Sequence, residues 1–333
     1  MKKLIGLIVS LSLLTGVLAG CAGTLADNSA TSTPEAAGKT DAGQVAWPRT
    51  IKDALGKQIT LKKKPEHVAI LDFGFMESMF ALETSPIAST YAERALKGFG
   101  TLQPYAANAK IENLGEGKAP NLEKLVELKP DLILYTAEPE HLDMKLYERA
   151  SQIAPVVTFN SPDWKEQLKK FAECLGKEKK AEVYISDIEA LIDESRKKLS
   201  GYSDKTVALL FESSGNKGNF VVRGSAENLV WFNKENGLGL THPDAYPEKG
   251  EAISLEGLAA MNPDYIFLFG SFGSEANGYM QSYLSEETQA SSVWQSLTAV
   301  KNGHVYHLDA AVRADGPLSI KLGIETIVKS MTK

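Results

Sequence analysis

The sequence predicts an α/β protein in which two similar lobes, each with a mainly parallel sheet, are joined by one long helix. The first observation is a repeat: NLEKLVELKPDLILYT at residues 121–136 returns 133 residues later as SLEGLAAMNPDYIFLF at 254–269. Two copies are too few for a solenoid and indicate two lobes of similar build. The second observation is a stretch between the copies, residues 177–199, that has helical apolar spacing and contains no Gly or Pro.

Residues 1–20 have the layout of a secretory signal peptide. Two lysines precede an apolar run that contains no acidic residue and ends at Leu18-Ala19-Gly20-Cys21. This ending resembles a bacterial lipobox, which implies that Cys21 becomes the lipid-carrying first residue of the mature protein. An ordinary signal with an incidental cysteine and an N-terminal membrane helix are the alternatives, although the run is short for a spanning helix.

Residues 21–46 are predicted to form a flexible, lipid-anchored tether, because they are rich in Ala, Thr, Ser, Gly and Asp and lack apolar periodicity. Removal of residues 1–20 takes away two lysines and no acid, which changes the net charge from −6 to −8. A chain this acidic is a poor partner for nucleic acid. The second cysteine, Cys174, is expected to be a small buried hydrophobe on a helix.

The N-terminal lobe is expected over residues 47–176. A polar stretch with strand-like alternation opens it, and strands and helices then follow in turn, which predicts a mainly parallel sheet covered on both faces. The expected strands lie at residues 67–71, 86–89, 132–136 and 155–159, and the expected helices lie at 76–83, 122–128, 143–153 and 164–175, with a loop at 90–110.

Residues 177–200 are expected to form the connecting helix, which would be about 33 Å long. Such a strut permits only small movements of the lobes, unless it breaks near Ser195. The C-terminal lobe is expected over residues 201–333. Its strands are predicted at 206–212, 265–269 and 302–309, and its helices at 227–235, 255–261 and 318–331.

The repeat raises a question about its two glutamates. Asn121 and Ser254 are suitable N-caps, so Glu123 and Glu256 fall in the first turn of their helices. A carboxylate there gains about 0.3 to 1 kcal/mol from the helix dipole, which accounts for both glutamates if the lobes share ancestry. The other explanation is that two equivalent exposed acids dock into basic sockets on a two-fold partner. The residues alone leave both explanations open.

The features taken together resemble those of one family. The lipobox, the tether, KKPEHVAIL at 63–71, the two repeats with each glutamate seven residues ahead of a proline, the long helix and WQSLTAVKNGHVYHLD at 294–309 are similar to the ferric-siderophore substrate-binding lipoproteins of ABC importers. They belong to the helical-backbone class of binding proteins, which also includes vitamin B12 and haem binders. The resemblance covers about residues 49–331.

The resemblance implies an extracellular, membrane-tethered monomer that captures a ferric siderophore and delivers it to the permease subunits of an ABC transporter. It also implies that Glu123 and Glu256 contact arginines of the two permease subunits. Iron would be held by the siderophore, so neither a protein ligand to the metal nor a cofactor is expected. The alternative is a haem- or cobalamin-binding component of a related importer, with Tyr91, Tyr135 or His242 as the haem contact.

In a two-lobe α/β protein the ligand is expected at the carboxyl ends of the strands, between the lobes. Three arginines fall in loops there, and guanidinium suits oxygen-rich anions because it stays charged and makes forked hydrogen bonds. The candidate ligand-binding residues are Arg94, Arg223, Arg313, Lys97, Lys118, Tyr91, Phe73, Phe272 and Trp231. The alternatives are solvated arginines, an Arg223 that pairs with Glu212 or Glu227, and a Trp231 that lies in the core.

The resemblance implies a denser basic cluster for relatives that bind tris-catecholate iron complexes. Glu212, Glu93 and Glu138 depart from that pattern, so hydroxamate and mixed carboxylate siderophores stay open. A direct transition-metal binder would need clustered His and carboxylate ligands. His304 and His307 lie three apart on a predicted strand and are expected on opposite faces.

An enzyme is the weakest interpretation of the sequence. It contains neither a G-x-S-x-G nor an H-E-x-x-H motif. The stretch SSGNKGN at 213–219 lacks the strand-to-helix context of a phosphate-binding loop. We therefore expect a binding protein without enzyme activity.

Overall fold

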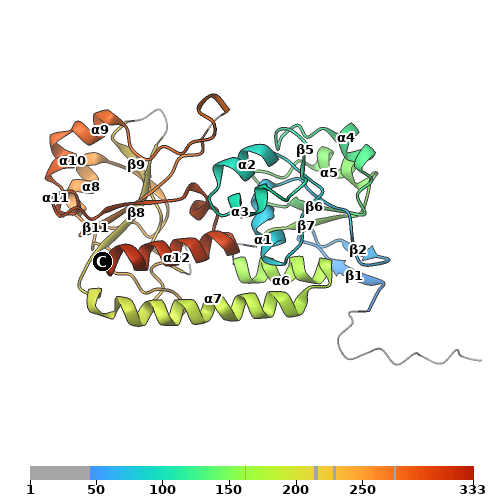
Figure 1. The fold of residues 1–333 in the computed structure, drawn as a ribbon, viewed down its shortest axis with the longest axis horizontal. Coiled ribbons are helices and arrows are strands. Elements are labelled where there is room, and N and C mark those ends of the chain that lie inside the picture. The colour runs from blue at the N-terminus through green and yellow to red at the C-terminus, as the bar shows by residue number, and fades with distance from the viewer. Residues whose placement is uncertain (1–45, 162, 214–216, 228–229, 274) are drawn as a thin grey trace, which may run out of the picture. The chain divides into compact units, whose positions relative to one another are not determined.

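Two five-stranded sheets, one in each lobe, form the framework of the protein (Figure 1). The computed structural model describes residues 46–333 apart from 162, 214–216, 228–229 and 274. The predicted signal peptide, Cys21 and nearly all of the predicted tether therefore lie outside the described residues. The described residues belong to one compact unit. None of their helices is long and apolar enough to cross a membrane.

The sheet of the N-terminal lobe is wholly parallel, with the strand order β5-β4-β3-β6-β7. β6 is buried along its whole length, as expected of an apolar strand that has helices on both faces. An antiparallel hairpin precedes the sheet. The strands of this lobe are β1 (Arg49–Lys52) and β2 (Gln58–Leu61) in the hairpin, and β3 (Val68–Ile70), β4 (Ala88–Ser89), β5 (Glu112–Asn113), β6 (Leu132–Thr136) and β7 (Val156–Phe159) in the sheet.

The helices of the N-terminal lobe include two that the sequence analysis missed. The expected loop at residues 90–110 contains α2 and α3, because Ala92, Ala95, Phe99 and Leu102 recur at helical spacing and are all buried. The helices are α1 (Met76–Ala81), α2 (Ala92–Gly98), α3 (Gln103–Ala106), α4 (Leu122–Leu128), α5 (Met144–Ser151) and α6 (Trp164–Leu175), with a short 3-10 helix η1 (Phe73–Phe75) before α1.

The sheet of the C-terminal lobe is mixed, with the strand order β10-β9-β8-β11-β12. β8, β11 and β12 pair in parallel, whereas β9 pairs antiparallel with both β8 and β10. β9 and β10 were not predicted. The strands are β8 (Val207–Glu212), β9 (Asn219–Val222), β10 (Glu251–Ser254), β11 (Tyr265–Phe269) and β12 (Val305–Leu308). The helices are α8 (Leu255–Met261), α9 (Glu286–Ala290), α10 (Ser292–Ser296), α11 (Thr298–Lys301) and α12 (Pro317–Met331), with 3-10 helices η3 (Glu275–Asn277) and η4 (Ala310–Ala314).

The helix expected at residues 227–235 is wrong for the residues described there, which form turns. The carbonyl groups of Val230 and Trp231 accept hydrogen bonds from the amides of Leu238 and Leu240, at 2.6 and 3.1 Å. These bonds reach eight or nine residues along the chain instead of the four that a helix requires. Val230, Trp231 and Phe232 therefore form a core segment of irregular backbone.

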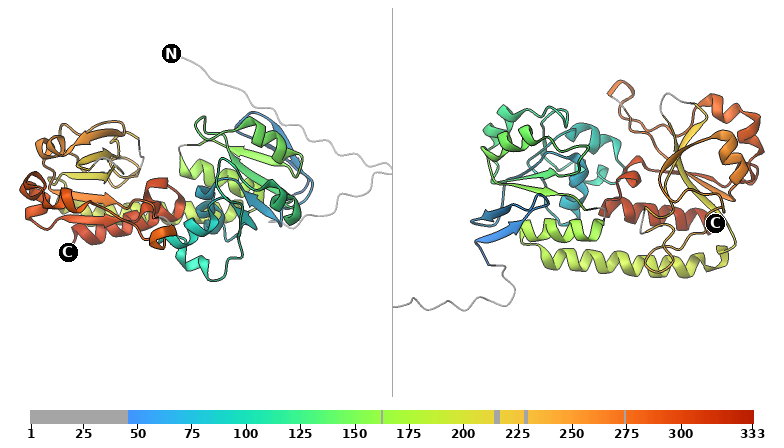
Figure 2. Two further views of the ribbon diagram at one scale, coloured as in Figure 1. Left: turned by 90° about the horizontal axis from the view of Figure 1, so that it is seen from above. Right: turned by 180° about the vertical axis from the view of Figure 1, so that it is seen from behind.

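The predicted connecting helix is α7 (Glu178–Leu199), which has 22 residues and runs along both lobes (Figures 1 and 2). Its apolar stripe, including Ala181, Ile185, Ile188 and Ile192, is buried against α6 and α12. The helix continues without a break through Ser195. A short 3-10 helix, η2 (Ser200–Tyr202), follows it and leads to β8.

The repeat in the sequence has the same structure in both lobes. Asn121 and Ser254 accept hydrogen bonds from the amides three residues on, at 2.9 and 3.1 Å, and so cap α4 and α8. Each helix ends at a left-handed residue, Lys129 or Asn262, directly before the repeated Pro-Asp pair. The helix, the turn and the following strand are therefore set by the same positions of the repeat.

The repeated aspartates link each helix-strand turn to the start of the neighbouring strand. The Asp131 carboxylate accepts from the amides of Glu66 and His67, at 3.0 and 2.9 Å, ahead of β3. The Asp264 carboxylate accepts from the amide and the hydroxyl of Thr206, at 2.8 and 2.9 Å, ahead of β8. These charge-assisted bonds make the aspartates a structural part of the repeat.

The two lobes are joined by a buried carboxylate. Glu77 of α1 is 3% exposed and accepts from the Thr101 hydroxyl at 2.7 Å and from the Ser319 amide of α12 at 2.9 Å. The Ser319 amide is in the first turn of α12, where amide groups lack partners within the helix. Burial raises the pKa of Glu77 to about 7 from an ordinary 4.5.

Removal of the repeated aspartate should destabilise the fold, whereas removal of the repeated glutamate should not. We expect Asp264→Ala to lower the free energy of unfolding by about 1.5 to 3 kcal/mol, because two bonds to a charged acceptor are lost. Glu256→Ala, in the same repeat, should cost less than about 1 kcal/mol. Urea unfolding of both variants measures the difference, and equal losses would contradict the assignment of a structural role to the aspartate alone.

The raised pKa of Glu77 predicts a particular dependence of stability on pH. Between pH 4.5 and 7 the folded protein holds a proton on Glu77 that the unfolded chain has released, so the free energy of unfolding falls as pH rises through this window. The contribution amounts to about 3 kcal/mol. In Glu77→Gln this part of the decline should disappear. Urea unfolding of both proteins at pH 5 and pH 8 tests it, and parallel declines would contradict the prediction.

Candidate functional site: the cleft between the lobes

The carboxyl ends of the N-terminal strands surround a pocket of about 240 Å³. Three of the candidate ligand residues meet there: Phe73 after β3, Tyr91 after β4 and Lys118 after β5. This is where a parallel sheet is expected to place a ligand site. The lining residues are Leu71, Asp72, Phe73, Thr90, Tyr91, Gly117, Lys118, Tyr135, Thr136 and His141.

The backbone places the Tyr91 ring in this pocket. Tyr91 has the left-handed conformation, with φ 48°, and its amide donates to the Gly115 carbonyl at 2.8 Å. Its ring packs edge-on against Phe73, with 5.6 Å between the centroids. A positive φ is uncommon for residues other than glycine. The few residues that adopt it cluster at ligand and active sites. Asp72, whose carboxylate accepts from the Gly74 amide at 2.9 Å, has its pKa raised by burial.

Arginines from both lobes approach one aromatic ring. The guanidinium carbon of Arg94, in α2, lies 5.5 Å from the ring centroid of Phe272, and that of Arg313, in η4, lies 5.4 Å from it. Arg313 also stacks on Phe211 at 3.6 Å. Both distances fall within the range of cation–π attraction. Phe272 follows β11, so the carboxyl ends of strands in both sheets contribute to this place.

Arg223 joins this group through a partner that the sequence did not suggest. Its guanidinium donates to the Arg313 carbonyl at 3.0 Å and forms an ion pair with Asp315. Burial lowers the pKa of Arg223, and burial followed by the positive charge of Arg223 lowers that of Arg313. The two side chains therefore lie close together. Arginine nevertheless stays charged at neutral pH.

Glu212 does not pair with Arg223, contrary to one alternative from the sequence. Its carboxylate accepts from the amides of Gly218 and Ser285, at 3.0 and 2.6 Å, and from the hydroxyls of Ser285 and Thr288. These bonds hold the start of α9 against the end of β8. Both oxygens of the Glu212 carboxylate therefore have hydrogen-bond partners within the protein. Glu227 accepts instead from the Gly224 amide, at 3.3 Å.

The remaining candidates differ in their surroundings. Trp231 as a ligand wall is a correction: it is 0% exposed and packs against Gly323 of α12, because Val230, Trp231 and Phe232 all turn into the core. Lys97 forms an ion pair with Glu93 at 2.7 Å and lies 5.7 Å from the Tyr279 ring. Lys118 is exposed at the rim of the pocket. Cys174 is buried, as expected, and burial raises its pKa to about 12.

Two of the three suggested haem contacts are occupied by other bonds. The Tyr135 hydroxyl donates to the His141 carbonyl at 3.1 Å and accepts from the Asp143 amide at 2.9 Å. His242 Nδ1 lies at hydrogen-bond distance, 2.9 Å, from the Pro243 carbonyl oxygen, and the His242 ring packs against Phe232 and Tyr246. Tyr91 remains at the pocket. Within the described part of the chain, no three His, Cys, Asp or Glu side chains gather in a group that could hold a metal ion.

Glu123 and Glu256 occupy equivalent, exposed positions in the first turns of α4 and α8. Among residues 46–333, leaving aside the undescribed positions, neither carboxylate has a hydrogen bond or an ion pair. Glu256 borders a hollow of about 400 Å³ that the Lys217–Glu287 ion pair also lines. The two glutamates are thus free to meet another surface.

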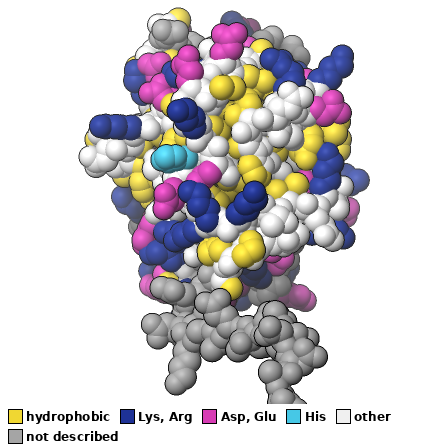
Figure 3. All heavy atoms as spheres, turned by 90° about the vertical axis from the view of Figure 1, so that its right-hand side faces the viewer, with side chains coloured by type: hydrophobic (Ala, Val, Ile, Leu, Met, Phe, Trp, Pro, Cys, Tyr) yellow, Lys and Arg dark blue, Asp and Glu magenta, His cyan; other side chains and the backbone are white. Residues whose placement is uncertain are grey.

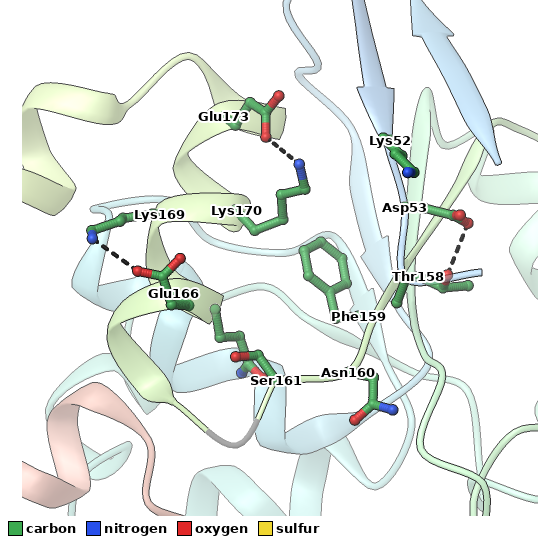
Figure 4. Close-up of a pocket in the computed structure, with 12 residues that line it drawn as sticks. Lys52, Asp53, Thr158, Phe159, Asn160, Ser161, Glu166, Lys169, Lys170 and Glu173 are labelled. Carbon is green, nitrogen blue, oxygen red and sulfur yellow. Dashed lines mark hydrogen bonds and ion pairs between the residues drawn. The ribbon is translucent and has the colours of Figure 1, made fainter. Parts of the chain in front are cut away.

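Another hollow, of about 360 Å³, lies between the β1-β2 hairpin and α6 and contains none of the candidate ligand residues (Figure 4). Its lysines are balanced by acids: Lys169 pairs with Glu166 at 3.0 Å and Lys170 with Glu173 at 2.6 Å. The end of the N-terminal lobe likewise shows basic and acidic side chains interspersed (Figure 3). This mixed charge favours a solvated surface over a site for an anion.

Polar contacts between the lobes were not predicted from the sequence. The Gln281 side chain donates to the Gly98 carbonyl at 2.7 Å and to Asp309 at 3.0 Å, and the Gly100 amide donates to Asp309 at 3.0 Å. The interlobe partners lie 183 and 209 residues apart in the chain. No local pattern could have indicated these pairs, since neither the spacing nor the residue type is distinctive.

Comparison with known proteins adds a family and several relatives. Residues 100–312 match the model of a family described as periplasmic binding protein. The chain is 33% identical over 201 residues to the iron-uptake system-binding protein of Bacillus subtilis (strain 168), which covers 59% of this chain and 61%, less than two thirds, of that protein. It is 30% identical over 245 residues to the iron(3+)-hydroxamate-binding protein FhuD of the same organism, covering 67% and 69%.

A solved structure supports the same fold. The chain is similar to a periplasmic binding protein component of a Fep/Fec-like ferrichrome ABC transporter from Bacillus subtilis, with a TM-score of 0.66 and 26% identity. The match covers 85% of this chain and 99% of that chain. The α/β architecture with two lobes, predicted from the repeat and the long helix, is confirmed by this likeness.

Proposed function

The chain belongs to the periplasmic binding protein family, and on this premise we propose that it captures a ferric siderophore in the cleft between its lobes and delivers it to an ABC permease. The observation that carries the proposal is the approach of Arg94 and Arg313, from different lobes, to one aromatic ring beside the N-terminal pocket. A ligand there would touch both lobes. The names of two relatives, an iron-uptake system-binding protein and an iron(3+)-hydroxamate-binding protein, support the choice of ligand.

The basic groups suit the oxygen-rich surface of a ferric chelate. Arg223 and Arg313 offer several N–H donors in the half-buried part of the cleft, where hydrogen bonds to an anion are stronger than in water. Two of the acids that disfavour an anionic ligand have partners within the protein. The Glu212 carboxylate accepts from the Ser285 amide at the start of α9, and Glu93 forms an ion pair with Lys97. Iron is the cargo of the siderophore, so this function needs no enzyme activity and no resident cofactor.

Delivery requires a second surface, for which Glu123 and Glu256 are the proposed contacts. Their equivalent positions fit a permease with two related subunits that present arginine sockets. Cys21, outside the described residues, would carry the lipid that keeps a monomeric receptor at the outer face of the membrane.

The arginines should be needed for binding. We expect Arg223→Ala and Arg313→Ala each to weaken binding of a ferric siderophore about tenfold or more, because a hydrogen-bonded charge is removed from a half-buried site. Arg149→Ala, which removes an exposed arginine from α5, is the matched control and should leave the Kd unchanged. Titration calorimetry against a ferric hydroxamate, a ferric catecholate, ferric citrate, haem and cobalamin measures this. Binding of haem or cobalamin alone would overturn the siderophore assignment.

The docking glutamates should be needed for uptake but not for binding. The double variant Glu123→Arg with Glu256→Arg should abolish uptake of a radiolabelled ferric siderophore by cells and leave the Kd within about twofold, since charge reversal opposes the arginine sockets. The matched control reverses two exposed acids of α7, Glu182→Arg with Asp187→Arg, and should transport normally. Normal uptake by the docking variant would contradict the proposed partner surface.

A further inference from the structure

The end of η4 and the turn that leads from it to α12, residues 313–316 (the 313–316 turn), hold Arg223. The Arg313 carbonyl accepts from the Arg223 guanidinium at 3.0 Å, and the Asp315 carboxylate pairs with the same group. Asp315 has φ 51°, the left-handed conformation, so the chain reverses sharply at this point. The direction of the Arg223 guanidinium therefore depends on the shape and position of the turn.

The N-terminal lobe fixes this turn at its downstream end. The Glu77 carboxylate accepts from the Ser319 amide at 2.9 Å, and it lies so close to Gly316 that any Cβ at position 316 would overlap it. Gly316 is the N-cap residue of α12 and makes no side-chain capping bond, so Glu77 supplies the cap from the other lobe. The Tyr184 hydroxyl of α7 adds a bond to the Pro317 carbonyl at 2.9 Å.

The N-terminal lobe also fixes the upstream end of η4. Asp309, directly before η4, accepts from the Gly100 amide at 3.0 Å. Its other carboxylate oxygen accepts from the Ala311 amide at 2.9 Å and so caps η4. The segment that carries Arg313 is thus attached to the opposite lobe at both ends.

We propose that Glu77 is a positioning residue for ligand binding, which caps α12 from the N-terminal lobe and thereby holds the 313–316 turn, with Arg223 and Arg313, opposite Arg94 and Tyr91. Glu77 is 3% exposed and does not line the N-terminal pocket, so it acts through the turn. The inference rests on the proposed function, because the arginines matter here as ligand contacts. Its physical basis is preorganisation: a site whose donors are already fixed loses less freedom when the ligand binds.

A double-mutant cycle tests the coupling between Glu77 and the arginine, with the Kd of the purified full-length chain for a ferric hydroxamate or ferric catecholate as the readout. Glu77→Ala should raise the Kd about tenfold, and the same change in an Arg223→Ala background should raise it less than about twofold. Glu77→Gln keeps an oxygen that can accept from the Ser319 amide and should restore the Kd to within about threefold of wild type. Glu83→Gln removes an exposed acid that pairs with Lys180 of α7 and should change nothing.

A purely structural role for Glu77 would give a different result. In that case Glu77→Ala would raise the Kd by the same factor with and without Arg223, and this additive outcome would overturn the inference. Should Glu77→Ala fail to fold, Gly316→Ala replaces it in the cycle, because the added methyl displaces the carboxylate without deleting it. An unchanged Kd in the replacement variant overturns the inference as well.

The wild-type titration separates this inference from the proposed function. If the wild-type chain binds neither ferric siderophore, the proposed function fails and the inference fails with it. If the wild type binds and the Glu77 cycle shows no coupling, the inference fails alone and the proposed function stands.

Discussion

The structure depends on holding two sheets in a fixed relation although they share no strand. Hydrogen bonds of the β-ladder stop at the edge of each sheet, so the connection between lobes must come from helices and side chains. α7 connects the two lobes, and its buried apolar stripe packs on α6 from one lobe and on α12 from the other. One apolar core cluster consequently extends from β1 to the end of α12. Close packing of this kind couples the position of one lobe to that of the other.

That constraint explains why the contacts across the cleft are specific. Packing of α7 sets the distance between the lobes, but it does not determine how the loops at the strand ends face one another. Glu77 and Asp309 do this by accepting from backbone amides that have no partner in their own element. A backbone amide has a fixed position in the fold, so the carboxylate that accepts from it is held in one place. The segment that carries Arg313 and holds Arg223 is consequently attached to both lobes.

The two-lobe framework could be predicted from the sequence because it depends on residues that lie close together in the chain. The repeat, with its N-caps, its left-handed helix ends and its Pro-Asp pair, needs only a few neighbouring residues, and so does the apolar stripe of α7. Prediction failed at residues 227–235, where the apolar run bonds to Leu238 and Leu240 instead of forming a helix. It failed at Arg223 for a related reason, since Asp315 is 92 positions away in the chain. The cleft is made of such distant pairs, so its candidate residues could be named but not assembled.

The carboxylates of the molecule fall into two groups, and the difference bears on function. Asp131, Asp264, Glu212, Glu77 and Asp309 each accept from backbone amides, which makes them part of the fold and removes them from consideration as ligand or partner contacts. Glu123 and Glu256 lie in the same repeats as two of these acids, yet they are exposed and contribute at most the helix-dipole term. The exposed glutamate at the same position in both lobes is the observation on which the proposed docking surface rests.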